Sequence, residues 1–175
     1  METQRYAVFL RAINVGGRRV KMDDLRSVFV GAGFPDAQTY IASGNVVVSA
    51  KMPPDRVRIE TAIESELGFA SEAFVRSEDQ TRSILERVPW DTSDNLVEVS
   101  FLQDAPADVD ARRLEAMVVQ PEQLVVSGAE VFFLREGKGV DTRHKESVTS
   151  ATLHRVTTRR GIATVEKIAA RFFGP

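Results

Sequence analysis

Three short segments combine arginine with glycine and with hydroxyl or amide side chains, and they are the parts of the sequence that could bind an anion. The first runs from Arg11 to Arg19, the second is Ser43-Gly44-Asn45, and the third is residues 157–161, Thr-Thr-Arg-Arg-Gly. Proteins bind phosphate and carboxylate with guanidinium groups, hydroxyls and the backbone N–H groups of such turns. The candidate ligand-binding residues are Arg11, Asn14, Gly16, Gly17, Arg18, Ser43, Gly44, Asn45, Thr158 and Arg159.

Gly16-Gly17 has both a functional and a structural interpretation. It lies between a predicted strand and a predicted helix, where backbone N–H groups can hold an anion. However, the segment matches neither GxxxxGK[ST] nor GxGxxG, and Asp23 and Asp24 follow in the first turn of the helix, where they repel phosphate. The sequence therefore argues against a nucleotide P-loop. Two interpretations stay open. The segment is either a weaker anion site made by Arg11 and Asn14, or a turn in which glycine is needed for the backbone conformation.

The other two segments also have structural interpretations. Ser43-Gly44-Asn45 is a hairpin signal, because glycine and asparagine tolerate positive φ. If the first two strands are neighbours, its polar groups face Asn14 and the two segments share a functional surface. Residues 157–161 precede the last predicted helix, so a threonine there caps that helix within a solvated basic turn. Alternatively, Thr158 and Arg159 form a second anion-binding site.

No residue is identified as catalytic, and we expect neither a bound metal nor a cofactor. His144 and His154 lie ten residues apart with no carboxylate cluster around them, which is not the spacing of a metal site. Ser147 is close to His144, but no G-x-S-x-G motif supports a serine nucleophile. The chain has no cysteine, which excludes disulfide bonds, thiolate metal ligands and a cysteine nucleophile.

Charge is distributed unevenly along the chain. The 175 residues carry a formal net charge of −2, but residues 1–134 contain 14 Lys and Arg against 21 Asp and Glu, whereas residues 135–175 contain 9 against 4. This basic last quarter fits an anionic small molecule or a nucleic acid as partner. No apolar run approaches the roughly 18–20 residues of a membrane span, and the N-terminus has no signal-peptide pattern. We therefore expect a cytoplasmic protein with no membrane partner.

Hydrophobic periodicity and turn residues predict the order β-α-β-β-α-β for the first part of the chain. This order is typical of the ferredoxin-like, or split βαβ, fold. The predicted strands are Tyr6–Ile13, Gln38–Ala42, Val46–Ser49 and Phe69–Arg76. The predicted helices are Asp23–Ala32, a segment between Pro54 and Gly68, and a capped helix that begins at Ser77 and stops at Pro89-Trp90.

The polar, turn-rich residues Asp91–Asn95 are the predicted boundary, and beyond them the order begins again as β-α-β-β, an irregular segment and a helix. We therefore predict an α+β protein of two ferredoxin-like subdomains in tandem, residues 1–90 and 91–175. The elements predicted for the second subdomain are Val97–Leu102, Ala107–Val118, Gln123–Val126, Glu130–Arg135, a loop at Gly137–Gly139 and a helix over Ile162–Phe172.

Several segments of the sequence resemble those of a bacterial family, the domain of unknown function 1697. That family opens with a pattern close to LRGINVGG, followed by a basic stretch, a Met, a helix and a Tyr-Ile-x-Ser-Gly-Asn turn. The resemblance spans nearly the whole chain, implies two ferredoxin-like halves and brings no assigned reaction. The matching residues are Leu10–Gly17, Met22, Tyr40–Asn45, Phe101-Leu102, Thr157–Arg159 and Thr164–Lys167.

Two positions depart from the family's pattern. Ala12 stands where the family usually has glycine. Arg160-Gly161-Ile162 stands where the family usually has an Asn-aromatic pair, and the segment is one residue longer.

Three functional hypotheses follow. The first is a module that binds a phosphate-bearing or other anionic ligand through the basic, polar turns. The second is a small enzyme that acts on an anionic substrate at the interface of the two halves, where ligand sites are common. The third is a structural or interaction protein that forms a homodimer through an exposed strand edge.

Overall fold

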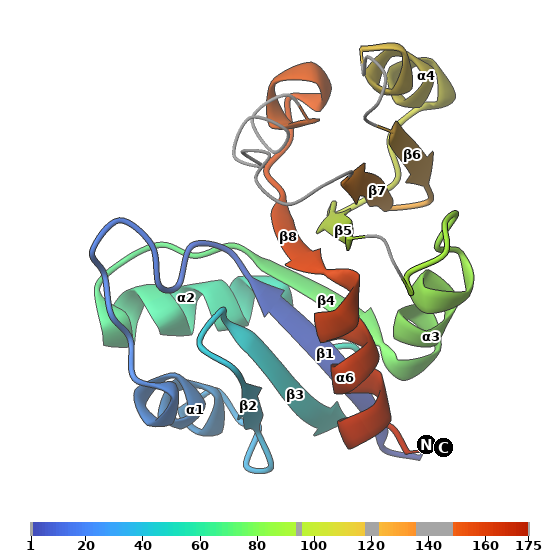
Figure 1. Ribbon diagram of the computed structural model, residues 1–175. Helices are drawn as coiled ribbons and strands as arrows, with labels where there is room; N and C mark the ends of the chain where they lie inside the picture. The colour runs from blue at the N-terminus through green and yellow to red at the C-terminus, as the bar shows by residue number, and fades with distance from the viewer. Residues whose placement is uncertain (1, 94–95, 118–122, 136–148, 175) are drawn as a thin grey trace. The chain divides into compact units, whose positions relative to one another are not determined.

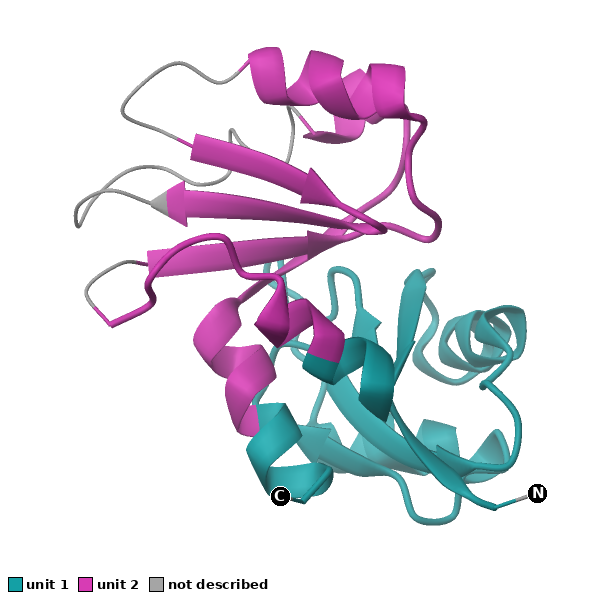
Figure 2. Cartoon of the chain, turned by 90° about the vertical axis from the view of Figure 1, so that its right-hand side faces the viewer, with its two compact units in different colours: residues 1–82, 168–175 teal, residues 83–167 magenta. Residues whose placement is uncertain are grey.

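The computed structural model describes residues 2–93, 96–117, 123–135 and 149–174 (Figure 1). The chain divides into two compact units: unit 1 comprises residues 1–82 and 168–175, and unit 2 comprises residues 83–167 (Figure 2). Each unit combines helices with a four-stranded antiparallel sheet, which confirms the predicted α+β class. The division at Arg82 does not test the predicted boundary, which stays a prediction.

Unit 1 is built on a sheet with the strand order β2-β3-β1-β4, in which every neighbouring pair is antiparallel. β1 and β3 are central and largely buried, which explains their continuous apolar sequences. Its elements are β1 (Gln4–Leu10), α1 (Met22–Gly31), β2 (Gln38–Tyr40), β3 (Asn45–Ala50), α2 (Arg56–Leu67) and β4 (Ala73–Ser77).

Helices α1 and α2 cover one face of this sheet (Figure 1). Leu25 and Phe29 of α1 and Ile63 of α2 are buried in one core with Val8 of β1 and Val48 of β3. The spacing Leu25, Val28, Phe29 in the sequence therefore identifies the core-facing side of α1, as expected for an amphipathic helix.

The ends of two helices follow from their local sequence. Asp55 caps α2, since its Oδ1 accepts a hydrogen bond of 2.9 Å from the Val57 N–H, and Gly68 ends the helix at φ 77°. α3 (Glu78–Glu86) begins with a capping box. Its Ser77 N–H donates to Gln80 Oε1 at 2.9 Å, and the Gln80 N–H donates to Ser77 Oγ at 3.1 Å. The predicted capped helix is confirmed.

Unit 2 is built on a sheet with the order β6-β7-β5-β8, again antiparallel throughout. Leu114 of α4 packs in a core with Val131 and Phe133 of β7 and Leu124 of β6. Residues 149–153 are helical. The elements of this unit are β5 (Leu96–Phe101), α4 (Asp108–Ala116), β6 (Gln123–Ser127), β7 (Glu130–Arg135) and β8 (Thr158–Gly161).

Several expectations from the sequence are wrong in detail. β2 ends at Tyr40 rather than at Ala42, and β4 begins at Ala73 rather than at Phe69. β1 ends at Leu10 rather than at Ile13, because Ala12 takes a left-handed conformation (φ 54°), which departs from the extended backbone of a strand. Residues 157–161 do not form a solvated basic turn: positions 158–161 are strand β8, which pairs with β5, and Thr158 and Arg160 are buried. The predicted loop at 137–139 lies outside the described residues.

The last helix, α6 (Ile162–Phe172), begins in unit 2 and ends in unit 1. In unit 1 its end is held by polar contacts. Arg82 Nη2 donates to the carbonyl oxygens of Phe173 (3.1 Å) and Gly174 (2.8 Å), and Arg5 Nη1 donates to that of Phe172. The Phe172 ring meets the Tyr40 ring edge-on at a centroid distance of 6.1 Å. The C-terminal residues are therefore part of the first unit's structure.

Among the described residues, no helix combines the length and the apolar character that a membrane span requires.

Candidate anion-binding site

Two of the three predicted segments meet at one corner of unit 1. Asn14 Nδ2 donates a hydrogen bond of 2.7 Å to the Ala42 carbonyl, and the Leu10 N–H donates one of 2.8 Å to the Gly44 carbonyl. The pairing of β1 with β3, which places Phe9 opposite Asn45, brings the two loops together. We call residues 11–20 and 40–45 the basic corner; it contains three arginines and no carboxylate.

Asn14 holds the corner together with its side-chain amide. Besides the bond to Ala42, Asn14 Oδ1 accepts a hydrogen bond of 2.6 Å from the Val20 N–H, and Nδ2 lies 3.4 Å from the Val20 carbonyl oxygen. The amide thus closes the loop from Asn14 to Val20 and joins it to the hairpin. Its donor and acceptor are used within the protein, so Asn14 positions the corner.

Gly44 and Asn45 also serve the scaffold. Asn45 is buried, and its Nδ2 donates to the Tyr40 carbonyl (3.0 Å) and to Ser43 Oγ (2.8 Å). Gly44 has φ 77°, and a Cβ added there would lie 2.6 Å from Cγ1 of Ile13. Only glycine fits this position, since both its conformation and its close approach to Ile13 exclude a side chain.

The three arginines of the corner differ in the interactions that they make with other residues of the protein. Arg18 lies with Cζ 3.7 Å from the centroid of the Phe69 ring and donates from Nη1 to the Ala12 carbonyl at 3.0 Å. Arg11 Nη1 lies 3.5 Å from Glu72 Oε2 in an exposed, and therefore weak, ion pair. Arg19 is exposed and makes no hydrogen bond or ion pair with another described residue.

A pocket of about 400 Å³ is lined by two of these arginines, Arg18 and Arg19. Its volume is within the range of about 300–1,000 Å³ that is usual for small-molecule sites. Gly17, which lines the pocket, and its neighbour Gly16 have φ 85° and 60°, so two consecutive residues are left-handed and their N–H groups lie in an irregular, exposed loop. The residues that line the pocket are Asn14, Gly17, Arg18, Arg19, Val20 and Ala42.

Backbone strain is concentrated at the same corner. Among the described residues, three that are not glycine have positive φ, and two of them, Ala12 (φ 54°) and Ile41 (φ 48°), belong to the corner. For a β-branched residue such as isoleucine this conformation is a true outlier. Strain of this kind is frequent at ligand-binding and active sites. His154 of unit 2 is the third such residue (φ 50°).

The third predicted segment, residues 157–161, belongs to unit 2. Arg159 Nη1 lies 3.6 Å from Glu98 Oε2, and the two side chains are only 11% and 19% exposed. Arg160 Nη1 donates to Thr158 Oγ1 at 3.0 Å. This segment is therefore engaged in the sheet of unit 2, and a ligand-binding role for Thr158 and Arg159 stays a prediction.

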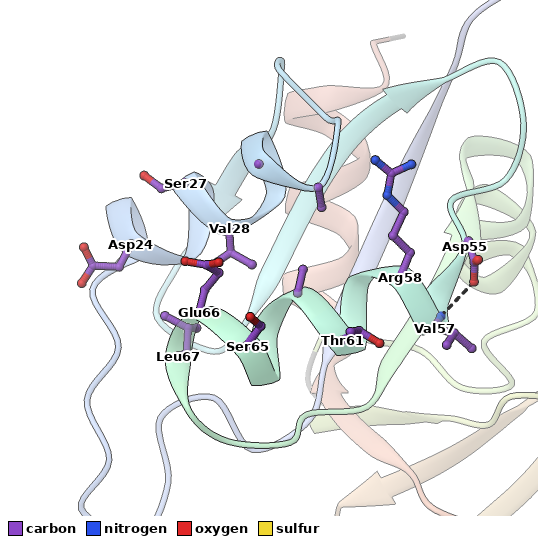
Figure 3. Close-up of a pocket in the computed structure, with 13 residues that line it drawn as sticks. Asp24, Ser27, Val28, Asp55, Val57, Arg58, Thr61, Ser65, Glu66 and Leu67 are labelled. Carbon is purple, nitrogen blue, oxygen red and sulfur yellow. Dashed lines mark hydrogen bonds between the residues drawn. The ribbon is translucent and has the colours of Figure 1, made fainter.

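A groove between α1 and α2, which the sequence did not indicate, is larger but carries the wrong charge for an anion (Figure 3). Its volume is about 950 Å³, and it is lined by three carboxylates, Asp24, Asp55 and Glu66, and one cation, Arg58. The Asp55 carboxylate already caps α2 through Val57. Among the described residues, no three His, Cys, Asp or Glu side chains lie so that they could together hold a metal ion, these three carboxylates included.

Sequence reasoning missed the residues in the loop before β4 that support the corner. Ser71 Oγ donates to the Arg11 carbonyl at 2.7 Å, and the Arg11 N–H donates to the Glu72 carbonyl at 2.9 Å. Phe69 supplies the ring below Arg18. These contacts join residues about fifty to sixty positions apart, and no local pattern signals them.

The chain belongs to the family described as "Protein of unknown function (DUF1697)", whose model matches residues 3–132. This confirms the family that the sequence resembles; the similar segments at 157–159 and 164–167 lie outside the matched residues. No curated protein matches the chain.

Two solved structures are similar to it. The conserved bacterial protein SP0830 from Streptococcus pneumoniae shares a TM-score of 0.73 at 24% identity, over 96% of this chain and 97% of that chain, which shows a common fold. An unknown protein from Galdieria sulphuraria matches at a TM-score of 0.24 and 13% identity, over 91% of this chain and 99% of that chain, and supports no argument.

Proposed function

We propose that the basic corner binds a small phosphate-bearing or other anionic ligand. The observation that carries this proposal is the exposed guanidinium of Arg19, which lines a pocket of about 400 Å³ and has no partner among the described residues. Elsewhere in the corner, guanidinium groups are engaged by Phe69 or Glu72. A planar guanidinium is suited to bind phosphate with two parallel hydrogen bonds.

The surroundings of Arg19 support the same proposal. Arg18 is held in place by its stacking on Phe69, so its charge is fixed beside the pocket at little entropic cost. Gly17 offers a backbone N–H at the pocket edge. The N-terminus of α1 already has Asp23 and Asp24 in its first turn, so the anion is held by the loop and the arginines and not by the helix dipole.

We also propose that each unit has the ferredoxin-like fold. In unit 1 the element order β-α-β-β-α-β combines with the strand order β2-β3-β1-β4, which supports a split βαβ arrangement. In unit 2 the order β6-β7-β5-β8 repeats this arrangement, with β8 as the fourth strand. A scaffold of this kind presents loops at the ends of its strands, and the basic corner is made of two such loops.

The ligand hypothesis is tested by calorimetric titration of inorganic phosphate and pyrophosphate into the wild type and into the variants Arg19→Gln and Arg112→Gln. Arg112 is the matched control, because it is an exposed arginine on α4 in unit 2. A charge-assisted hydrogen bond contributes about 1.5–3 kcal/mol. We therefore expect Arg19→Gln to weaken binding by roughly 10- to 100-fold and Arg112→Gln to leave it unchanged. Equal affinities for all three proteins, or no binding to the wild type, would contradict the proposal.

A further inference from the structure

Two large apolar side chains of the basic corner are exposed, and each is next in sequence to a residue that lines the pocket. Val15 is 55% exposed and Ile41 is 51% exposed. Val15 follows Asn14 and Ile41 precedes Ala42, and both neighbours line the pocket. The hydrogen bond from Asn14 to Ala42 joins the two loops at this point. Since consecutive Cα atoms are about 3.8 Å apart, the backbones of Val15 and Ile41 lie close to the residues that line the pocket.

Ile41 occupies its position at an energetic cost. Its φ of 48° is a left-handed conformation, which glycine or asparagine adopts with much less strain than a β-branched residue. An isoleucine that is half exposed gains little from packing in the protein to offset this strain. Contact with a bound molecule would supply the missing burial.

We infer that the ligand of the basic corner is a phosphate ester of an aromatic or similarly apolar group. This inference rests on the proposed function. The phosphate binds Arg19 and the N–H of Gly17, and the apolar group covers Val15 and Ile41. Neither a free inorganic anion nor a fully hydroxylated phosphate ester would make use of the two apolar side chains.

The dimensions of the corner favour a small molecule over a macromolecule or a surface. A volume of about 400 Å³ suits one small ligand. Single-stranded nucleic acid usually stacks on exposed aromatic side chains along a groove, whereas the exposed apolar residues of the corner are aliphatic. Two exposed side chains also form too small an apolar area for stable anchoring in a lipid surface.

The test compares phenyl phosphate, glycerol 2-phosphate and inorganic phosphate as ligands of the full chain by calorimetry. We expect phenyl phosphate to bind about tenfold more tightly than glycerol 2-phosphate, because its ring buries apolar surface. The double variant Val15→Ser/Ile41→Asn should lose this difference and still bind inorganic phosphate. Asparagine is chosen because it tolerates the left-handed conformation. The control Val57→Ser changes a valine of α2 that is 56% exposed and should keep the difference.

The outcomes separate this inference from the proposed function. Equal affinities for phenyl phosphate and glycerol 2-phosphate, with inorganic phosphate still bound, would overturn the inference alone. Failure of all three ligands to bind would overturn both. If the wild type showed no preference for phenyl phosphate but bound phosphatidylglycerol vesicles, and lost that binding in the double variant, the apolar pair would belong to a lipid-binding surface and the inference would be wrong.

Discussion

At the scale of single residues, Ala12 and Asn14 determine the shape of the basic corner in opposite ways. Ala12 ends β1 with a left-handed residue (φ 54°), and its carbonyl accepts a hydrogen bond from Arg18. Asn14 then ties the loop to the hairpin with its amide. The first residue introduces strain, and the second supplies hydrogen bonds that hold the strained loop in place.

Replacement of Ala12 by glycine should stabilise the protein. The left-handed conformation costs an alanine about 1 kcal/mol, and glycine adopts it without that penalty. The free energy of unfolding, measured with urea, should therefore rise by up to about 1 kcal/mol, less the extra entropy of glycine in the unfolded chain. Ala170→Gly on the exposed side of α6 is the control and should lower it by roughly 0.5–1 kcal/mol. A loss of stability in both variants would show that Ala12 is not strained.

Replacement of Asn14 by alanine should destabilise unit 1 and weaken phosphate binding together. The change removes the partners of the Val20 N–H and the Ala42 carbonyl, and each lost bond contributes about 0.5–1.5 kcal/mol. Urea unfolding should show a loss of about 1–3 kcal/mol. Asn14→Asp keeps the acceptor for the Val20 N–H and loses only the donor to the Ala42 carbonyl. It should therefore lower the free energy of unfolding by less than Asn14→Ala does. An unchanged stability of Asn14→Ala would mean that the loop closes without the amide.

At the scale of elements, strand β8 shows where sequence reasoning fails. The segment Thr-Thr-Arg-Arg-Gly has the composition of a solvated basic turn, yet its residues 158–161 form an edge strand in which Thr158 and Arg160 are buried. The reason lies about sixty residues away, in β5, where Glu98 lies beside Arg159. Amphipathic helices, capping boxes and hairpin turns could be predicted, because their signals are local. A strand that forms by pairing with a distant strand could not.

The pair of Arg159 and Glu98 should contribute to the stability of unit 2. Its side chains are only 11% and 19% exposed, so removal of one partner leaves a largely buried charge without its counter-ion. We expect Arg159→Ala to lower the free energy of unfolding by about 2–4 kcal/mol. A double-mutant cycle with Glu98→Ala should give a coupling of about 1 kcal/mol or more. A coupling free energy near zero would show that the two side chains do not stabilise each other, and it would favour a ligand-binding role for Arg159.

At the scale of the whole molecule, the chain returns to its first unit at its end. α6 begins in unit 2, but Ile168 and the residues after it belong to unit 1, where Arg82 and Arg5 hold the last carbonyl groups. The sequence predicted the α+β class and the bounds of α6, since both depend on local patterns. It could not predict that α6 is shared, because its partners Tyr40 and Arg82 are far away in the sequence.

Replacement of Phe172 by alanine should therefore destabilise unit 1, which is otherwise formed by the first half of the chain. The ring is buried and contacts Tyr40, and a buried Phe→Ala change costs about 3–5 kcal/mol. Hydrogen exchange should show the loss of protection in β1 and β3. Phe172→Leu, which keeps most of the apolar volume, should lose much less. Full protection of β1 and β3 in Phe172→Ala would show that unit 1 does not depend on the C-terminus.

The most direct test of the central claim is to follow the backbone amide signals by NMR while inorganic phosphate is added to the full chain. If the basic corner binds the anion, the largest shifts will come from Gly16, Gly17 and Arg19, and they will saturate with one dissociation constant. The same titration of Arg19→Gln will show small shifts that do not saturate over the same range. Saturating shifts centred on β8 in the wild type, with Gly16 and Gly17 unmoved, would contradict the account and place the anion in unit 2.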